Sequence, residues 1–100
     1  MDMMKMMKQA TAMQKEMKKK QKMLAKETVE FSSTGGAVTI KMTCDLKTQS
    51  VEIQPELVNP AEIKKLEGAV LDAVKGAINL AQSAAEKEMK SLTAGMDLPF

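Results

Sequence analysis

The sequence contains no histidine, arginine, tryptophan or tyrosine among its 100 residues, and only two phenylalanines. Without arginine, the bidentate contact that most often identifies guanine is missing, and lysine is left to bind phosphate as a point charge. Base stacking, the usual means of holding single strands, has only Phe31 and Phe100 as candidates. A nucleic-acid ligand would therefore be held by its backbone, with little reading of its bases.

Cys44 is the only cysteine, so no disulfide can form within the chain. A reducing compartment is then the expected environment. Cys44 lies in a strand-like run of residues, where a free cysteine more often acts as a small buried apolar side chain than as a reactive thiol. We therefore predict a structural role, with a reactive thiol as the alternative.

Signatures of catalysis and of targeting are also missing. The chain has no metal-ligand cluster, and Gly35-Gly36 lacks the lysine and the following helix that a phosphate-binding loop requires. Lysines interrupt the apolar residues at the N-terminus, so no signal peptide is expected, and no apolar run is long enough to cross a membrane. We predict a soluble cytoplasmic protein that is not an enzyme and has no cofactor, metal or small-molecule substrate.

Charge is divided unevenly along the chain, although the net charge is only +2. Residues 1–26 hold eight of the fifteen lysines and two of the thirteen acids, which gives this segment a charge of +6. The remaining residues hold seven lysines and eleven acids, which gives −4. Such an asymmetry indicates an acidic partner, either a nucleic acid or an anionic membrane surface.

Residues 1–26 also have the pattern of an amphipathic helix, because apolar residues recur there at helical spacing. This methionine seam consists of Met3, Met6, Ala10, Met13, Met17 and Leu24, with Lys20 as a charged exception. The other lysines form a stripe on the opposite side of the predicted helix. A solvated outer face is the ordinary interpretation. However, like charges this close together repel and destabilise a helix, which favours a polyanion partner.

Between residues 27 and 58 the apolar period changes from that of a helix to that of a strand. The alternating runs are residues 28–31, 38–43 and 50–54, separated by a turn at 33–36 and a connection at 45–49. Short connections of this kind predict a three-stranded antiparallel meander. Each strand has one apolar and one polar face, so we expect a helix to cover one side of the sheet and solvent to wet the other.

Residues 59–62, Asn-Pro-Ala-Glu, make a good helix start, with asparagine as the cap and proline in the first turn. The apolar pattern that follows predicts a helix over residues 60–93, about 50 Å long if unbroken, with Gly95 as the stop. Gly68 and Gly76 leave open whether the helix is straight or bent. A compact chain of this size has a radius of gyration of about 13 Å, so such a helix must protrude or pack on a second chain.

Residues 76–85 carry no charge and are rich in small side chains. We predict a subunit interface here, with intrachain core as the alternative. The predicted interface residues are Gly76, Ala77, Ile78, Leu80, Ala81, Ala84 and Ala85.

These elements together predict a single α+β domain over residues 1–100. Its parts are a basic amphipathic helix at 1–26, a three-stranded sheet at 27–58, a long C-terminal helix at 59–94 and a tail at 95–100.

Four groups of residues carry a family resemblance. They are the glycine turn Gly35–Ile40; the strand with its proline exit, Val51–Leu57; the helix positions Leu66, Glu67, Val70, Ala73, Val74 and Ala77; and Met89, Leu92, Thr93, Gly95, Leu98 and Pro99. In this order and spacing the chain resembles the YbaB/EbfC family of bacterial nucleoid-associated DNA-binding proteins over nearly its whole length. It departs from the family pattern at residues 43–49, which lack the frequent Asn-Gly turn, and at Lys75-Gly76, where the family tends to have Asn-Asp.

The resemblance implies a homodimer with protruding helices that binds duplex DNA with limited sequence preference. It also implies a role in nucleoid organisation and often in gene regulation. It brings no catalytic residues and no cofactor.

We therefore predict a dimeric nucleoid-associated protein that contacts duplex DNA mainly through lysine–phosphate interactions. The lysines expected to bind DNA are Lys5, Lys8, Lys15, Lys18, Lys19, Lys22, Lys26, Lys87 and Lys90. For Lys87 and Lys90, ordinary surface pairing with neighbouring glutamates is the alternative. The alternative function is a protein-interaction or anionic-membrane module built on the methionine-rich basic helix. The membrane partner is the less expected of the two, because the seam lacks the large apolar side chains of good interfacial helices.

Overall fold

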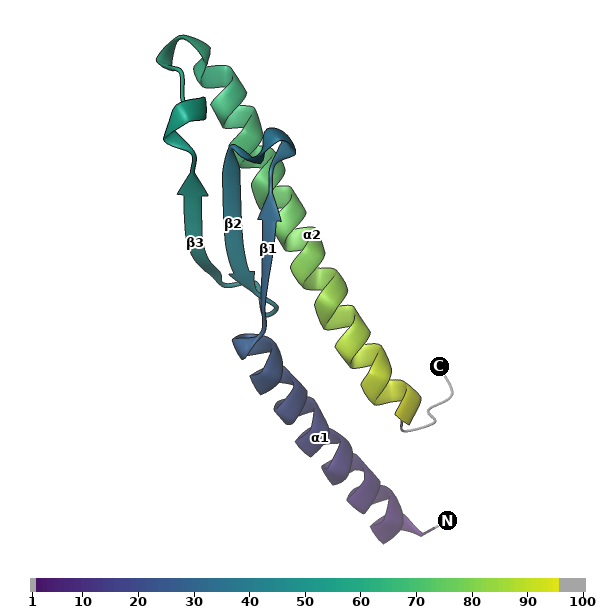
Figure 1. Ribbon diagram of the computed structural model, residues 1–100. Coiled ribbons are helices and arrows are strands. Elements are labelled where there is room, and N and C mark those ends of the chain that lie inside the picture. Colours follow the sequence, from purple (N-terminus) through teal and green to yellow (C-terminus); the bar gives the residue numbers. More distant parts are fainter. Residues whose placement is uncertain (1, 96–100) are drawn as a thin grey trace.

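The computed structural model describes residues 2–95 (Figure 1). Its helices and strands are α1 (Met3–Lys26), β1 (Thr28–Ser32), β2 (Val38–Thr43), β3 (Thr48–Ile53) and α2 (Ile63–Gly95). The predicted α+β class and the order helix, three strands, helix are confirmed. Of the predicted tail at 95–100, only Gly95 lies among the described residues, so Leu98, Pro99 and Phe100 lie outside them.

The sheet is an antiparallel meander in the order β1-β2-β3. Phe31 of β1 pairs with Ile40 of β2, which in turn pairs with Val51 of β3. Directly paired residues of antiparallel strands point to the same face, so these three side chains share one face of the sheet. Thr39 and Glu52, which also pair, lie on the opposite and polar face.

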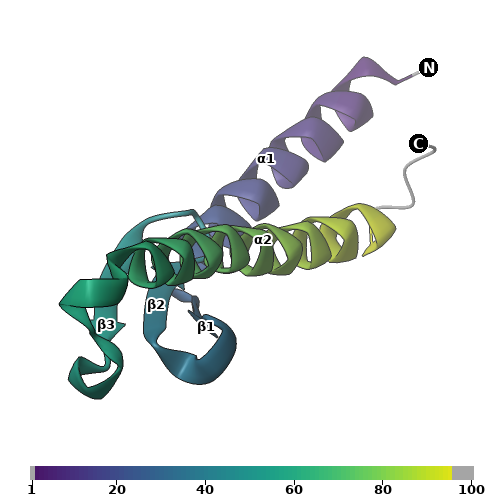
Figure 2. The same cartoon turned by 90° about the horizontal axis from the view of Figure 1, so that it is seen from above.

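Helix α2 covers the apolar face of β1 and β2, and Figure 2 shows the strands on one side of this helix. Val38, Ile40 and Met42 are buried against Ala73, Ala77 and Ala81, which recur every four residues along α2. Small side chains at this spacing let the helix approach the sheet closely. Ala77 and Ala81 are fully buried in the chain's own core, so their predicted place in a subunit interface is wrong.

Gly76 is also involved in this close approach. A β-carbon built at Gly76 would lie 2.1 Å from the Phe31 ring, so the ring occupies the space that any side chain would need. Because Gly76 faces β1, the opposite flank of α2, which carries Leu71 and Ile78, faces the side of β3. Gly68 has open space at the same position and no such contact.

Strand β3 is not covered in the same way, and all six of its residues are exposed. Val51 is 53% exposed and Ile53 is 42% exposed, although both share the apolar face with buried Ile40 and Val38. The prediction that helix would cover the apolar face is therefore right for β1 and β2 and wrong for β3. Helix α2 lies over β1 and β2, so β3, at the far edge of the sheet, is left beside the helix and not beneath it.

A short 3-10 turn at Pro60–Glu62 leads directly into helix α2, which continues unbroken to Gly95. The side-chain oxygen of Asn59 accepts the Ala61 N–H at 3.0 Å, which confirms the predicted cap. Gly95 was expected one residue beyond the helix and instead belongs to it. The helix has no break at either glycine, so α2 is a continuous rod of 33 residues.

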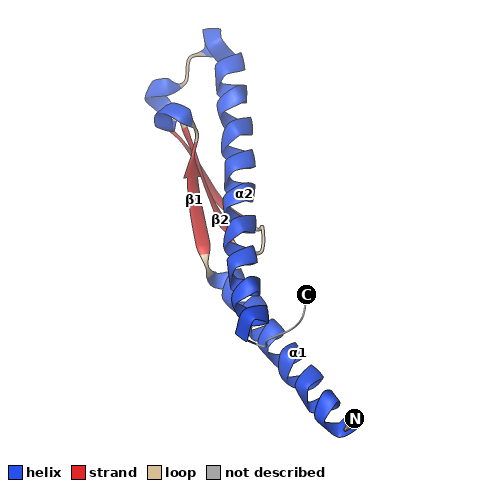
Figure 3. Ribbon diagram, turned by 90° about the vertical axis from the view of Figure 1, so that its right-hand side faces the viewer, coloured by secondary structure: helices blue, strands red, loops and turns tan. Residues whose placement is uncertain are grey.

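The molecule is elongated, measuring 70 × 22 × 15 Å with a radius of gyration of 19.5 Å. A compact chain of this length would have a radius of about 13 Å. Figure 3 shows the reason, since both helices continue past the end of the sheet and α1 reaches farther than α2. The expectation of protruding helices is met within a single chain.

Two turns connect the strands. In the first, Gly35 and Gly36 have φ angles of 84° and 75°, and the Ser33 N–H donates to the Val38 carbonyl at 2.8 Å, as expected for the predicted hairpin. The second is shorter than the predicted connection at 45–49, because β3 already begins at Thr48. Leu46 has a φ of 69° and takes the left-handed conformation that glycine usually supplies.

Candidate nucleic-acid interface

The last turn of α1 is anchored to the sheet. Leu24 is 6% exposed and is the only buried residue of this helix. The Cys44 N–H donates to the Leu24 carbonyl at 3.1 Å and to the Glu27 carbonyl at 2.9 Å. These contacts set the point from which α1 leaves the sheet.

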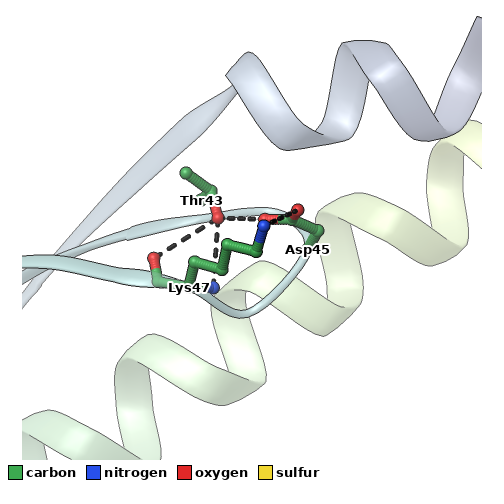
Figure 4. Close-up of polar contacts among 3 residues, drawn as sticks. All are labelled: Thr43, Asp45 and Lys47. Carbon is green, nitrogen blue, oxygen red and sulfur yellow. Dashed lines mark hydrogen bonds and ion pairs between the residues drawn. The ribbon is translucent and has the colours of Figure 1, made fainter.

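The turn that presents this N–H is held by its own polar contacts (Figure 4). The Thr43 hydroxyl donates to the Asp45 carboxylate and accepts the Lys47 N–H at 3.1 Å. The Thr43 N–H donates to the Lys47 carbonyl at 2.9 Å, which closes the turn. Burial raises the pKa of the Cys44 thiol, which fits the predicted structural role for this cysteine because the reactive thiolate is disfavoured.

The methionine seam packs only in its C-terminal half. Met13 and Met17 are half-buried, whereas Met3, Met6 and Ala10 are exposed, with Met6 at 54%. Residues 2–12 are all exposed. We call these residues the α1 tip, and it projects beyond the rest of the chain (Figure 1).

Lys20, the charged exception in the seam, has a partner on the other helix. Its Nζ donates to Oε2 of Glu88 at 2.8 Å, and the two side chains are 22% and 30% exposed. This hydrogen bond, with help from the charges of Glu88 and Glu16, raises the pKa of Lys20. Glu88 was missed as a site residue. The available signal was a lysine in an apolar seam, which requires an acidic group opposite.

The seven predicted lysines of α1 are all exposed and form what we call the lysine stripe. They are Lys5, Lys8, Lys15, Lys18, Lys19, Lys22 and Lys26. Within the part of the chain that the structure describes, no carboxylate forms an ion pair with any of the seven. The stripe is carried by a helix of 24 residues, about 36 Å long. Its charge is therefore available to an external anion.

The two predicted lysines of α2 are placed differently. Lys87 and Lys90 are exposed near the C-terminal end of α2, at the end of the molecule where α1 also protrudes (Figure 1). They share this end with the lysine stripe but belong to the other helix. The Glu88 carboxylate between them binds Lys20.

The remaining residues of the predicted subunit interface differ in how much of their surface is exposed. Gly76 lies beneath Phe31, while Ile78, Leu80, Ala84 and Ala85 keep part of their surface exposed. Ile78 lies on the flank of α2 that faces the side of β3. The structure therefore separates the predicted set into core residues and residues with open surface.

Comparison with known proteins identifies relatives of this chain. Residues 1–96 match the YbaB/EbfC DNA-binding family. The chain belongs to this family. This membership confirms the resemblance drawn from the sequence, and a DNA-binding family makes DNA the partner that the family implies.

Two relatives are named nucleoid-associated proteins. One, from Alkaliphilus metalliredigens, is 40% identical over 94 residues, which are 94% of this chain and 82% of that protein. Another, from Chloroflexus aurantiacus, is 40% identical over 91 residues, which are 91% of each chain. Neither name describes an enzyme.

A solved structure shares the fold. The crystal structure of an uncharacterized protein from Helicobacter pylori superposes with a TM-score of 0.70, at 19% identity, over 96% of this chain and 97% of that one. Among the described residues, no helix is both long and apolar enough to cross a membrane.

Proposed function

We propose that this YbaB/EbfC family member is a homodimeric nucleoid-associated protein that grips duplex DNA by lysine–phosphate contacts with low sequence specificity. The observation that carries the proposal is the lysine stripe, seven exposed lysines on a projecting helix without carboxylate partners among the described residues. Bound at many positions along cytoplasmic DNA, the protein would organise the nucleoid and influence the transcription of genes that it covers.

The chemistry of the stripe supports backbone contact. A lysine ammonium neutralises a phosphate and releases a condensed counterion, so binding of this kind weakens steeply with salt. Phosphate contacts position a protein on the duplex without reading sequence. The chain has no arginine to make bidentate contacts to guanine.

The uncovered face of β3 supports dimerisation. Val51 and Ile53 on β3, and Leu71 and Ile78 on the flank of α2 opposite Gly76, all keep apolar surface exposed, and we call these four residues the β3 ledge. Exposed apolar side chains on the core-facing side of a sheet usually mark an interface. A second copy seated there would bury the ledge of each subunit and leave both α1 helices projecting. The two stripes would then present twice seven lysines to one duplex.

The stripe is tested by replacing Lys18, Lys19 and Lys22 with glutamine and measuring affinity for random and defined duplexes at several salt concentrations. We expect weaker binding to all sequences alike. The slope of log affinity against log salt should become shallower by about 0.9 for each phosphate that the variant no longer neutralises. A matched control replaces Lys64, Lys65 and Lys75, three exposed lysines of α2, which changes the charge equally. If both triple variants weaken binding to the same extent, net charge rather than the stripe holds the DNA.

The dimer is tested by replacing Val51 and Ile53 with threonine, which keeps the β-branched shape that suits a strand. We expect the variant to sediment as a monomer at concentrations where the unchanged protein is a dimer, while circular dichroism shows an unchanged fold. Glu52→Gln, on the opposite face of the same strand, should sediment as a dimer like the unchanged protein. A monomeric unchanged protein, or a Val51/Ile53 variant that stays dimeric, contradicts this interface.

The alternative function, a protein-interaction or anionic-membrane module built on the methionine-rich basic helix, has one observation in its favour. The α1 tip exposes Met3, Met4, Met6 and Met7 beside lysines. Flexible methionines suit adaptable protein surfaces, and basic amphipathic helices bind anionic lipid. Co-sedimentation with anionic vesicles, compared with a duplex gel shift at the same salt, separates the possibilities. Vesicle binding without DNA binding would favour the alternative.

A further inference from the structure

The contact between Lys20 and Glu88 joins residues 68 positions apart in the sequence, one on each long helix. Lys20 lies one turn from Leu24, which anchors the end of α1 at the sheet. It also lies in the methionine seam, on the face of α1 that turns toward α2, and not on the outward-facing lysine stripe. Lys20 therefore differs from the seven lysines of the lysine stripe, because it lies on the side of α1 that faces α2 and because Glu88 is its partner.

The surroundings of Lys20 are acidic. Glu16, one turn away on α1, and Glu27, just beyond the end of this helix, both act on its charge in the same direction as Glu88. Only Glu88 also makes a hydrogen bond with the ammonium group. The pair is partly exposed, so dissolved salt and external anions have access to it.

This pair is well placed to control the direction of α1. Toward the N-terminus from Lys20, the seam residues Met13 and Met17 are only half-buried, and the α1 tip is fully exposed. The ion pairs at the start of α2 and in the second turn join residues close in sequence, whereas Lys20–Glu88 connects α1 to α2. A small rotation of α1 about its root at Leu24 would displace the tip by a much larger distance.

We infer that Glu88 is a positioning residue, which holds α1 along α2 through Lys20 and keeps Lys20 from contacting phosphate. The second half of this inference rests on the proposed DNA-binding function. A carboxylate and a phosphate oxygen are alternative partners for one ammonium group. Glu88 thus acts as an internal competitor of DNA. When phosphate displaces Glu88, α1 loses this polar contact with α2 and gains an additional DNA-binding lysine.

The test compares Glu88→Gln with Glu86→Gln in the full chain. Glu86 is exposed on the same helix, so both variants remove one negative charge from nearly the same place. Amide hydrogen exchange in α1, measured without DNA, should become about two- to fivefold faster in Glu88→Gln, the range for loss of a partly exposed ion pair. It should be unchanged in Glu86→Gln.

Duplex binding is measured on the same proteins at several salt concentrations. In Glu88→Gln the slope of log affinity against log salt should become steeper by about 0.9 for each Lys20 that gains a phosphate. The Glu86→Gln slope should equal that of the unchanged protein.

Equal exchange rates in the two variants would overturn the positioning role of Glu88. Faster exchange with an unchanged or shallower slope would overturn the competition with phosphate. If the unchanged protein shows no salt-dependent DNA binding, both the proposed function and the competition with phosphate fail. The exchange comparison then still decides whether Glu88 positions α1.

Discussion

Helices α1 and α2 are both long and amphipathic, with 24 and 33 residues, yet they are packed very differently. Helix α2 buries Ala73, Ala77 and Ala81 against the sheet. Helix α1 buries only Leu24 in its last turn. The same periodicity thus accompanies a core helix in one case and a largely solvated projecting helix in the other.

The difference lies in the side chains and in the space that the sheet offers. Alanines every four residues let α2 lie directly on β1 and β2, whereas the methionines of α1 are long and its seam is interrupted by Lys20. The short sheet has room for one helix over β1 and β2, and α1 leaves it at one end. An apolar stripe therefore shows which face of a helix can pack and does not show whether a surface is present for it.

The largest effect should come from truncating the anchor of α1. Leu24→Ala removes the only buried side chain of this helix, and the cavity should lower the free energy of unfolding by about 2–4 kcal/mol. Met6→Ala, in the exposed tip, should change it by less than about 0.5 kcal/mol. Urea unfolding at a fixed protein concentration measures both. If Met6→Ala lowered the free energy of unfolding as much as Leu24→Ala does, the α1 tip would have to be packed in the assembled protein.

A smaller effect should separate the two glycines of α2. Gly76→Ala forces a methyl group into the Phe31 ring, and overpacking of this kind costs about 1–3 kcal/mol, more than the helix-propensity gain of about 1 kcal/mol. Gly68→Ala has open space and should stabilise the fold by about 0.5–1 kcal/mol. Relative to the unchanged protein, the melting temperature and the urea midpoint should fall in Gly76→Ala and rise in Gly68→Ala. Equal stabilisation would mean that Phe31 rotates away without cost.

The smallest effect concerns the turn that holds the root of α1. Leu46 has a φ of 69°, a conformation strained for leucine by about 1 kcal/mol. Leu46→Gly should therefore raise the free energy of unfolding by about 0.5–1 kcal/mol, whereas Leu46→Ala should leave it unchanged or lower it. Urea unfolding of the two variants measures the difference. A destabilised glycine variant would show that the Leu46 side chain makes a contact in the assembled protein that outweighs this strain.

Much of the fold could be predicted because its signals are local. The change from helical to alternating periodicity near Glu27, the glycine turn at 35–36 and the cap at Asn59 each depend on a few neighbouring residues, and the structure agrees with them. The second turn was predicted too long, because Leu46 adopts a left-handed conformation without the glycine that usually signals it. A local rule fails when the rest of the fold enforces an unfavourable local conformation.

The candidate site was predictable only in part, for the same reason. The lysine stripe follows from helical spacing and a one-sided charge, so its seven exposed members could be named from the sequence. The pairing of Lys20 with Glu88 could not, because helical spacing carries no information about a residue 68 positions away. Residues 76–85 looked like an interface because small uncharged side chains suit any close approach, and Ala77 and Ala81 instead meet the chain's own sheet.

The sequence by itself determined the elements, the division of charge and the side of α1 on which the lysines lie, since each depends on spacing along one short segment. Only the tertiary structure decided that α2 covers β1 and β2, that β3 stays open, and that the α1 tip stands free of the rest of the chain. These outcomes depend on how much surface one helix can cover and on where the chain leaves the sheet. Such quantities exist only once distant segments have come together.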